Sequence, residues 1–410
     1  MAGTVLGGYW LRAHTHTRLG APNAPMYWFT RPDLTWWAAV AAIVLGAGAI
    51  AAPRLLRASP RRFLAGSALL AMATRVALNV SRGGPHELIG PLTGREGRHE
   101  YLPTVDRFLA DPIGYLRHFP ELIHTALPIH PSGHPPGATV VLAALQELGL
   151  GGAWPAALLI LVVGSLTVVP IYLLACELCD QASARLAVLA WLFAPNVLLI
   201  SATSMDAVFA SVATVAALLL VRRRAVAAGL ATAAAAFLSY ALLAVPVWAL
   251  ITLLLRRVHP RTLLGPAAIA IAVFAGSYLT LWLLTGYDPV SAFHATEHAY
   301  EHGVSTRRPL WFWIFGDLAV FLLGLGLPSV MLWSRALSRY DAAAIALAAT
   351  LVVASASGYA KAEVERIWLF LIPLAAVSIG PQLRTVRLRP VLLALAAQAL
   401  LVEVIFGTTW

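Results

Sequence analysis

The sequence predicts an all-α polytopic membrane protein with about 11–13 transmembrane helices. Of its 410 residues, 60% are hydrophobic and only 12% are charged, and the mean hydropathy is +0.77. A soluble domain of this length needs far more charged residues to cover its surface. Apolar runs near the ~17–25 residues that cross a bilayer recur along the chain. Lipid is therefore the solvent for most of this protein.

Twelve apolar runs are the candidate spans. We expect one transmembrane domain over 1–410, in which 1–62 adds an N-terminal span, 81–136 is a long loop and 137–410 forms the remaining bundle. The candidate spans are 36–52, 63–80, 156–179, 186–200, 207–221, 225–238, 240–255, 263–285, 310–333, 342–356, 367–379 and 391–406.

The arginines between these runs predict the orientation. The net charge is +10, from 29 Lys+Arg against 19 Asp+Glu. With alternating spans, five arginine clusters and Arg185 fall on one side, which by the positive-inside rule is the cytoplasm. This pattern explains the basic charge without a nucleic-acid partner. The clusters are Arg54, Arg57, Arg61 and Arg62; Arg222, Arg223 and Arg224; Arg256, Arg257 and Arg261; Arg335 and Arg339; and Arg384, Arg387 and Arg389.

The opposite side receives most of the polar residues that suit chemistry. The loop 81–136 is too long for a simple connection, so we expect interfacial helices within it. It carries Glu100 and Asp106, each of which is also compatible with a solvated surface carboxylate. Arg75 lies near the outer end of span 63–80, where an arginine is costly and usually paired or functional. Snorkelling to the interface is the simpler explanation.

Further polar residues stand at the same side of the predicted bundle. His134 precedes a Pro-Pro turn that starts a helix, and Asp206 occupies a tight turn where helix capping is an alternative role. The segment from Lys361 to Arg366 contains Glu363 and Glu365 and leads directly into a span. Its two outward-facing cations favour an anionic lipid headgroup as partner, with a surface ion cluster as the alternative.

A possible metal motif is present in the sequence His294-Ala-Thr-Glu297-His298. This H-x-x-E-H spacing puts two histidines on one helical face, as a zinc site requires. Because spacing fixes no third ligand, an amphipathic segment on the membrane surface explains the motif more simply. We therefore predict no metal site here, and the C-x-x-C pair Cys176 and Cys179 is interpreted as helix packing.

Five short motifs follow one another along the chain. They are Arg75 in an early span, His99-Glu100-Tyr101, His134-Pro135-Pro136, Ser239-Tyr240 and the run from Glu363 to Trp368. Taken in order, they resemble the GT-C superfamily of integral-membrane glycosyltransferases, which use polyprenyl-phosphate-linked sugars. The resemblance covers about residues 63–380, and its last motif is similar to that of actinobacterial members. One departure is that His99 precedes Glu100 where the family often has two adjacent acids.

The resemblance implies a hexosyl- or pentosyltransferase, similar to mannosyltransferases of cell-envelope biosynthesis, in a bacterial plasma membrane. It implies inverting sugar transfer to an acceptor hydroxyl on the extracytoplasmic side. A carboxylate would act as the base, and cations would stabilise the departing phosphate. The expected roles are catalysis by Glu100, with Asp106 as competitor; phosphate binding by Arg75, His134, Lys361 and Arg366; and substrate binding by His99, Tyr101, Asp206, Tyr240, Glu363 and Glu365.

The expected ligands follow from the same resemblance. The donor is a polyprenyl-phosphate sugar, the acceptor a glycan, glycolipid or protein, and membrane lipid surrounds the chain. No cofactor is required beyond the lipid-linked donor, although the pattern leaves room for a divalent cation. A transporter or lipid flippase is the alternative function, but transporters tend to show internal repeats and midplane polar residues. Neither is visible in this sequence.

Overall fold

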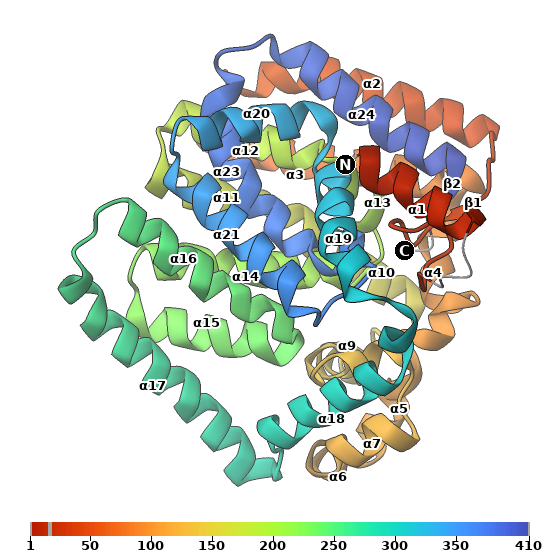
Figure 1. The fold of residues 1–410 in the computed structure, drawn as a ribbon, viewed down its shortest axis with the longest axis vertical. Coiled ribbons are helices and arrows are strands. Elements are labelled where there is room, and N and C mark those ends of the chain that lie inside the picture. The colour runs from red at the N-terminus through yellow and green to blue at the C-terminus, as the bar shows by residue number, and fades with distance from the viewer. Residues whose placement is uncertain (1, 15–18, 409–410) are drawn as a thin grey trace.

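The computed structural model describes residues 2–14 and 19–408, which fold mainly into helices (Figure 1). The first half contains short helices between its long ones. Its α-helices are α1 (Ala2–His14), α2 (Trp36–Leu55), α3 (Pro60–Asn79), α4 (Gly90–Thr93), α5 (Leu102–Ala110), α6 (Pro112–Arg117), α7 (Phe119–Thr125), α8 (Ile129–Gly133), α9 (Gly137–Glu147), α10 (Ala153–Leu166), α11 (Val168–Leu178), α12 (Gln181–Leu192) and α13 (Pro195–Ile200).

The second half continues the bundle with longer helices and returns to the first. Its α-helices are α14 (Asp206–Val221), α15 (Ala225–Leu238), α16 (Ala244–Leu255), α17 (Pro260–Thr285), α18 (Pro289–His302), α19 (Leu310–Leu325), α20 (Leu327–Ser338), α21 (Ala342–Ser357), α22 (Val364–Ile367), α23 (Ile372–Leu383) and α24 (Leu388–Ile405). The 3₁₀ helices of the chain are η1 (Val80–Arg82), η2 (Pro85–Leu88), η3 (Glu96–His99), η4 (Tyr240–Leu243), η5 (Val304–Arg307) and η6 (Leu369–Leu371).

The all-α polytopic class is confirmed, but fewer elements are full-length spans than the sequence suggests. Within the described residues, six helices are long and apolar enough to cross a membrane, or eight if two bent pairs each count as one span. The expected span 186–200 is broken before Pro195, because proline disfavours a helical conformation in the residue that precedes it. The expected span 310–333 is likewise divided at Gly326, whose φ is +92°. Four other apolar helices are shorter than a full span.

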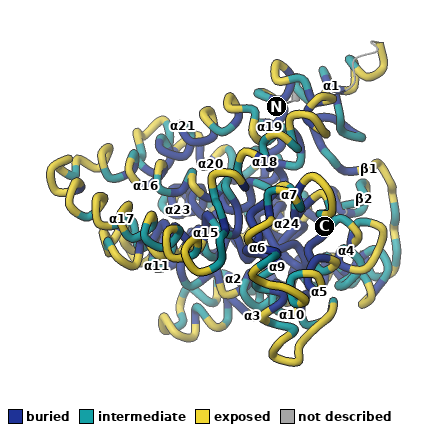
Figure 2. The backbone as a smooth tube through the Cα atoms, turned by 90° about the horizontal axis from the view of Figure 1, so that it is seen from below, coloured by how far each residue is buried: buried dark blue, intermediate teal, exposed yellow. Residues whose placement is uncertain are grey.

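Helices α12 and α23 pack against each other and are almost entirely buried. In Figure 2 the chain around α23 is dark blue, in the interior of the molecule. The two helix backbones approach closely at Gly380, where an added Cβ would collide with the Ser183 carbonyl. Small residues at helix contacts are the usual way in which membrane helices gain close packing. By contrast, α17 lies at the edge of the molecule, against α15 (Figure 1).

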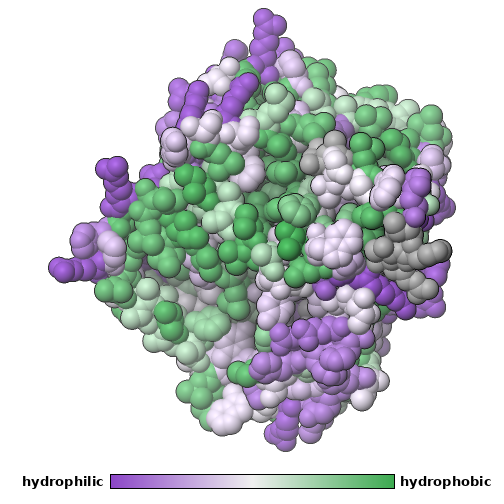
Figure 3. Space-filling model, in the orientation of Figure 1, coloured by the Kyte–Doolittle hydropathy of each residue, from purple (hydrophilic) through white to green (hydrophobic). Residues whose placement is uncertain are grey.

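Residues 81–136 fold into a layer of short helices, as expected for the long loop. Helix α7 packs against α18, and α5 packs against α9. In Figure 3 hydrophilic residues gather at the lower right, where Figure 1 shows α18 with α5–α7, and a largely hydrophobic zone separates them from hydrophilic residues at the upper left. This surface is the pattern expected for a protein whose middle faces lipid.

A short segment of the N-terminal region pairs with the C-terminal end of the described chain. Strand β1 (Phe29–Thr30) pairs antiparallel with β2 (Phe406–Gly407). Arg82 donates hydrogen bonds to the carbonyls of Phe406 (2.7 Å) and Arg31 (2.6 Å). The residues that precede β1 contact the segment 361–366, where the backbone N–H of Tyr27 donates to Glu365 Oε1 at 2.9 Å.

Candidate active site

A cavity of about 430 Å³ lies between α8, η4, α18 and the segment 357–371. Its wall combines apolar residues with a cluster of charged, histidine and tyrosine side chains, which is the composition typical of ligand sites. The polar groups come from parts of the chain that are far apart in sequence. They are His130, His134, Tyr240, Glu297, Tyr300, Arg308, Tyr359, Lys361, Glu363 and Arg366.

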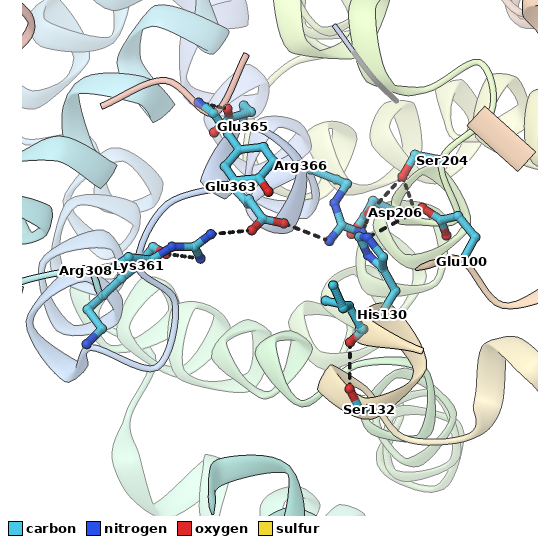
Figure 4. A network of polar contacts seen from close by, with 12 residues as sticks. Glu100, His130, Ser132, Ser204, Asp206, Arg308, Lys361, Glu363, Glu365 and Arg366 are labelled. Carbon is cyan, nitrogen blue, oxygen red and sulfur yellow. Dashed lines mark hydrogen bonds and ion pairs between the residues drawn. The ribbon is translucent and has the colours of Figure 1, made fainter. Parts of the chain in front are cut away.

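A chain of ion pairs crosses one wall of this cavity (Figure 4). Arg308 Nη2 lies 2.7 Å from Glu363 Oε1, and Glu363 Oε2 lies 3.6 Å from Arg366 Nη2. Arg366 Nη1 then contacts Asp206 Oδ2 at 3.0 Å. The Ser204 hydroxyl donates to the same Asp206 oxygen at 2.6 Å. Two guanidinium groups and two carboxylates thus alternate, which keeps buried charges paired.

Lys361 adds positive charge at the Arg308 end of this chain. Its carbonyl accepts a 2.7 Å hydrogen bond from Arg308 Nη1, and its ammonium group lies 3.4 Å from the Ser305 carbonyl. Among the described residues, no carboxylate lies within ion-pair distance of this ammonium group. Burial, together with nearby Arg308, lowers the pKa of Lys361. This end of the cavity therefore suits an anion.

Glu100 lies at the opposite end, beside Asp206 and His130 (Figure 4). Its side chain is nearly buried, and its Oε1 lies 3.9 Å from His130 Nε2. Burial raises the pKa of Glu100 to about 7, although the positive charge of Arg366 acts in the opposite direction. A carboxyl group with such a pKa is poised to accept a proton near neutral pH.

The two histidines at the Glu100 end of the cavity, His130 and His134, are neutral at pH 7. Burial lowers the pKa of His134 to about 4 and that of His130 well below its usual value. His134 therefore offers a phosphate a hydrogen bond but no positive charge. Its ring contacts Tyr101 edge to face, with centroids 6.2 Å apart, which places Tyr101 behind the cavity wall.

Several predicted site residues lie in or directly behind the cavity wall. His134, Tyr240, Lys361, Glu363 and Arg366 line it. Glu100 and Asp206 contact lining residues, as described above, and Tyr240 packs edge to face against Phe293 at 5.2 Å.

Other predicted site residues lie outside the wall. Asp106 is exposed on α5 and accepts a 3.0 Å hydrogen bond from Gln146. Arg75 is fully buried in the bundle, where it donates to Ser165 at 3.0 Å. Glu365 is fully buried under the N-terminal segment, and His99 is half-buried without lining the cavity.

The structure also assembles residues that the sequence prediction omitted, chiefly Arg308 and His130. Arg308 stands in the predicted outer segment 287–308, but the neighbouring Arg307 and the arginines of 81–136 leave it without a distinguishing signal. His130 stands four residues before His134, but spacing alone does not show that it faces Glu100. Ser204 had no signal beyond its place in the tight turn with Asp206.

The H-x-x-E-H segment forms part of α18. His294 Nδ1 lies 3.4 Å from Glu297 Oε2, whereas His298 stacks on His302 with ring centroids 4.0 Å apart. Within residues 2–14 and 19–408, no group of three or more His, Cys, Asp or Glu side chains is arranged to hold a metal ion. Glu297 instead accepts a hydrogen bond from the Tyr359 hydroxyl at 2.9 Å.

A second hollow, of about 340 Å³, lies between α15, α16 and α17. Its wall is almost wholly apolar, with Arg223 at one end. Leu243 lines both this groove and the polar cavity, so the two are neighbours. Because it has no converging polar groups, the groove is suited to an apolar chain and offers no catalytic residues.

Among solved structures, the fold is similar to that of ArnT from Cupriavidus metallidurans bound to undecaprenyl phosphate. The TM-score is 0.50 with 17% sequence identity, and the match covers 79% of this chain and 60% of that chain. The present chain thus spans about three fifths of the structure that it matches. No protein-family model and no curated protein matches the sequence. The chain therefore shares the helical membrane-protein fold of ArnT.

Proposed function

We propose that this protein, which shares the fold of ArnT, is a membrane glycosyltransferase that moves a sugar from a polyprenyl-phosphate donor to an acceptor hydroxyl. One observation carries the proposal. A single cavity has guanidinium and ammonium groups at one end, and at its other end a nearly buried carboxyl group with a pKa of about 7 lies directly behind the lining residue His130. These are the two groups that the reaction needs, a phosphate site and a base.

The phosphate end comprises Lys361, Arg308 and Arg366. As the bond between sugar and phosphate breaks, negative charge accumulates on the phosphate, and fixed cations stabilise that charge. Lys361 already lies without a carboxylate partner among the described residues, and Arg308 presents a planar guanidinium at the same wall. The similar fold of ArnT, whose crystal structure is bound to undecaprenyl phosphate, supports a lipid phosphate in this role.

The base in this proposal is Glu100. Asp206 Oδ2 is already engaged by an ion pair with Arg366 and a hydrogen bond from Ser204. Asp106 is exposed and points to Gln146 outside the cavity wall. Glu100 combines burial, a raised pKa and contact with the lining residue His130. Direct displacement by the activated hydroxyl would invert the anomeric centre.

The lipid tail has a route in the same part of the molecule. The apolar groove between α15, α16 and α17 adjoins the polar cavity at Leu243. A prenyl chain in this groove keeps its apolar surface out of water while its phosphate reaches Lys361. We propose that the acceptor hydroxyl approaches from the Glu100 end, so that the two substrates meet beside Arg366.

The test measures sugar transfer from polyprenyl-phosphate donors by purified protein in liposomes. Glu100→Gln retains shape and donor binding, and we expect it to lower transfer by about 10²–10⁴-fold, the usual contribution of a positioned base. Asp106→Asn, the matched control, should remain within about threefold of the parent. Near-parental transfer by Glu100→Gln would remove Glu100 from the base role. A flippase would move lipid across the bilayer without transfer by any variant.

We further propose that the cavity faces the extracytoplasmic side of a bacterial plasma membrane. The arginine clusters at the opposite side support this orientation. In a background with Cys176 and Cys179 replaced by serine, a cysteine at exposed Arg95 should react with an impermeant thiol reagent in intact cells. A cysteine at exposed Arg224 should react only after lysis. The opposite labelling pattern would reverse the orientation.

A further inference from the structure

The segment that carries the cavity's charges contains an unusual turn. Ala362 and Glu363 both adopt left-handed backbone conformations, with φ values of +68° and +60°. Residues with a Cβ atom avoid this region, and two in succession are rarer still. Strain of this kind persists only where the surroundings enforce it, and it concentrates at functional sites. The turn aims the Glu363 carboxylate between Arg308 and Arg366.

The backbone of this turn donates a hydrogen bond to a buried carboxyl group, that of Asp317. Asp317 lies in the apolar helix α19, is fully inaccessible to solvent, and accepts a 3.0 Å hydrogen bond at Oδ1 from the backbone N–H of Ala362. Its other oxygen, Oδ2, has no hydrogen-bond partner among the described residues. A carboxyl group inside an apolar helix is costly, so this position calls for a specific role. The proposed chemistry does not use Asp317.

The neighbouring residues of the turn have anchors of their own. The Lys361 carbonyl accepts from Arg308 at 2.7 Å, and the Glu365 carbonyl accepts from Asn196 at 2.9 Å. Asp317 therefore acts on the strained residues between these two fixed points. Removing it leaves Ala362 free to return to a commoner backbone conformation, which would turn Glu363 away from its two arginines.

We infer that Asp317 is a positioning residue for the donor phosphate site, because it holds Ala362 and Glu363 in the left-handed turn that sets the spacing of Arg308 and Arg366. The inference rests on the proposed function. Its chemistry is a hydrogen bond to a backbone N–H, so an amide oxygen at the same place should serve nearly as well. Glycine at position 362 should reduce the need for the anchor, since glycine adopts left-handed conformations without steric cost.

The experiment compares Asp317→Ala, Asp317→Asn, Ala362→Gly and the double variant Asp317→Ala/Ala362→Gly in the full-length protein. We expect Asp317→Ala to raise the donor KM about tenfold with a smaller change in kcat. Asp317→Asn and Ala362→Gly should stay within about threefold of the parent. In the double variant, the increase in the logarithm of the donor KM should be no more than half of that in Asp317→Ala. Ser355→Ala is the matched control, because it removes a partly buried hydrogen bond to the Ile314 carbonyl of the same helix without touching the turn.

A second measurement does not depend on transferase activity. Hydrogen exchange of the peptide containing Ala362 should accelerate in Asp317→Ala and remain parental in Asp317→Asn and Ser355→Ala. Additive effects in the double variant, or unchanged exchange and donor KM in Asp317→Ala, would overturn the inference. If the parent itself transfers no sugar while exchange accelerates as expected, the proposed function fails and the anchoring of the turn still stands. Folding of each variant is verified by its thermal transition in detergent.

Discussion

Helix α17 and the span Val364–Leu383 are both apolar enough to cross a membrane, yet the protein uses them in opposite ways. Their mean hydropathies are 2.0 and 1.5. None of the most apolar stretch of α17 is buried within the protein, whereas 89% of the corresponding stretch of Val364–Leu383 is buried. The less hydrophobic span lies in the core and carries Arg366 of the candidate site in its first turn, while the more hydrophobic one faces outwards.

The comparison shows that hydropathy identifies residence in the membrane without identifying the partner of each helix. Lipid tails are as apolar as leucine, so no hydrophobic force sorts one apolar helix to the centre and another to the edge. Close packing of small residues and buried polar contacts make that choice instead. Gly380 and the ion pairs of Arg366 provide both in the core span.

The largest predicted effect concerns the buried ion pairs of Arg366 in the core span. Arg366→Ala leaves buried Asp206 and partly buried Glu363 with one partner fewer. Removing one member of a buried pair typically destabilises a protein by about 3–5 kcal/mol. Thermal unfolding in detergent should show this loss, and transfer should fall with it. Arg366→Lys should restore only part, because lysine lacks the planar fork.

The control for this prediction is the exposed pair of Arg384 and Asp180, whose groups are 3.0 Å apart. Exposed pairs contribute about 0.2–1 kcal/mol, so Arg384→Ala should barely shift the unfolding transition. Equal shifts for the Arg366 and Arg384 variants would show that burial of the ion-pair chain has no energetic consequence.

A matched pair of leucine substitutions tests the two spans directly. Leu374 is fully buried in α23, whereas Leu283 of α17 is 68% exposed. Leu374→Ala should destabilise the protein by about 2–5 kcal/mol, because it removes buried contacts and leaves a cavity. Leu283→Ala should change stability by about 0.5 kcal/mol or less. A large loss for Leu283→Ala would indicate that α17 is covered by a partner protein.

The smallest predicted effect is the pH dependence of transfer. Glu100 must be ionised to accept a proton, and its pKa is raised to about 7 by burial. The rate kcat/KM should therefore rise about tenfold from pH 6 to pH 8. Residual transfer by Glu100→Gln should be flat over this range, and a flat parental profile would contradict the assignment.

The raised pKa of Glu100 also predicts how the stability of the protein changes with pH. Because the folded state holds the Glu100 proton more tightly than the unfolded state, folding binds a proton between about pH 4.5 and pH 7. The contribution of this group to stability is therefore complete below that window and declines as the pH rises through it. Glu100→Gln should remove this dependence from the thermal transition.

The sequence by itself determined the membrane character of the chain, its helical class and the presence of a structured loop in 81–136. Composition and the length of apolar runs are local properties, so no tertiary contact is needed to interpret them. The order of the short motifs also predicted a fold of the kind that this chain shares with ArnT. The number of full spans was harder to predict from the sequence, because breaks at Pro195 and Gly326 divide runs that are continuous in hydropathy.

Only the tertiary structure decided which polar residues meet. Arg366 pairs with Asp206 across 160 positions, and Arg308 with Glu363 across 55. Such contacts depend on how α14, α19 and α22 pack, and no local pattern encodes that packing. The fold likewise left Asp106 at the surface and enclosed Glu100, although both carboxylates stand in the same loop. Burial raises the pKa of Glu100, and burial is a property of the assembled protein that a residue's neighbours in sequence do not specify.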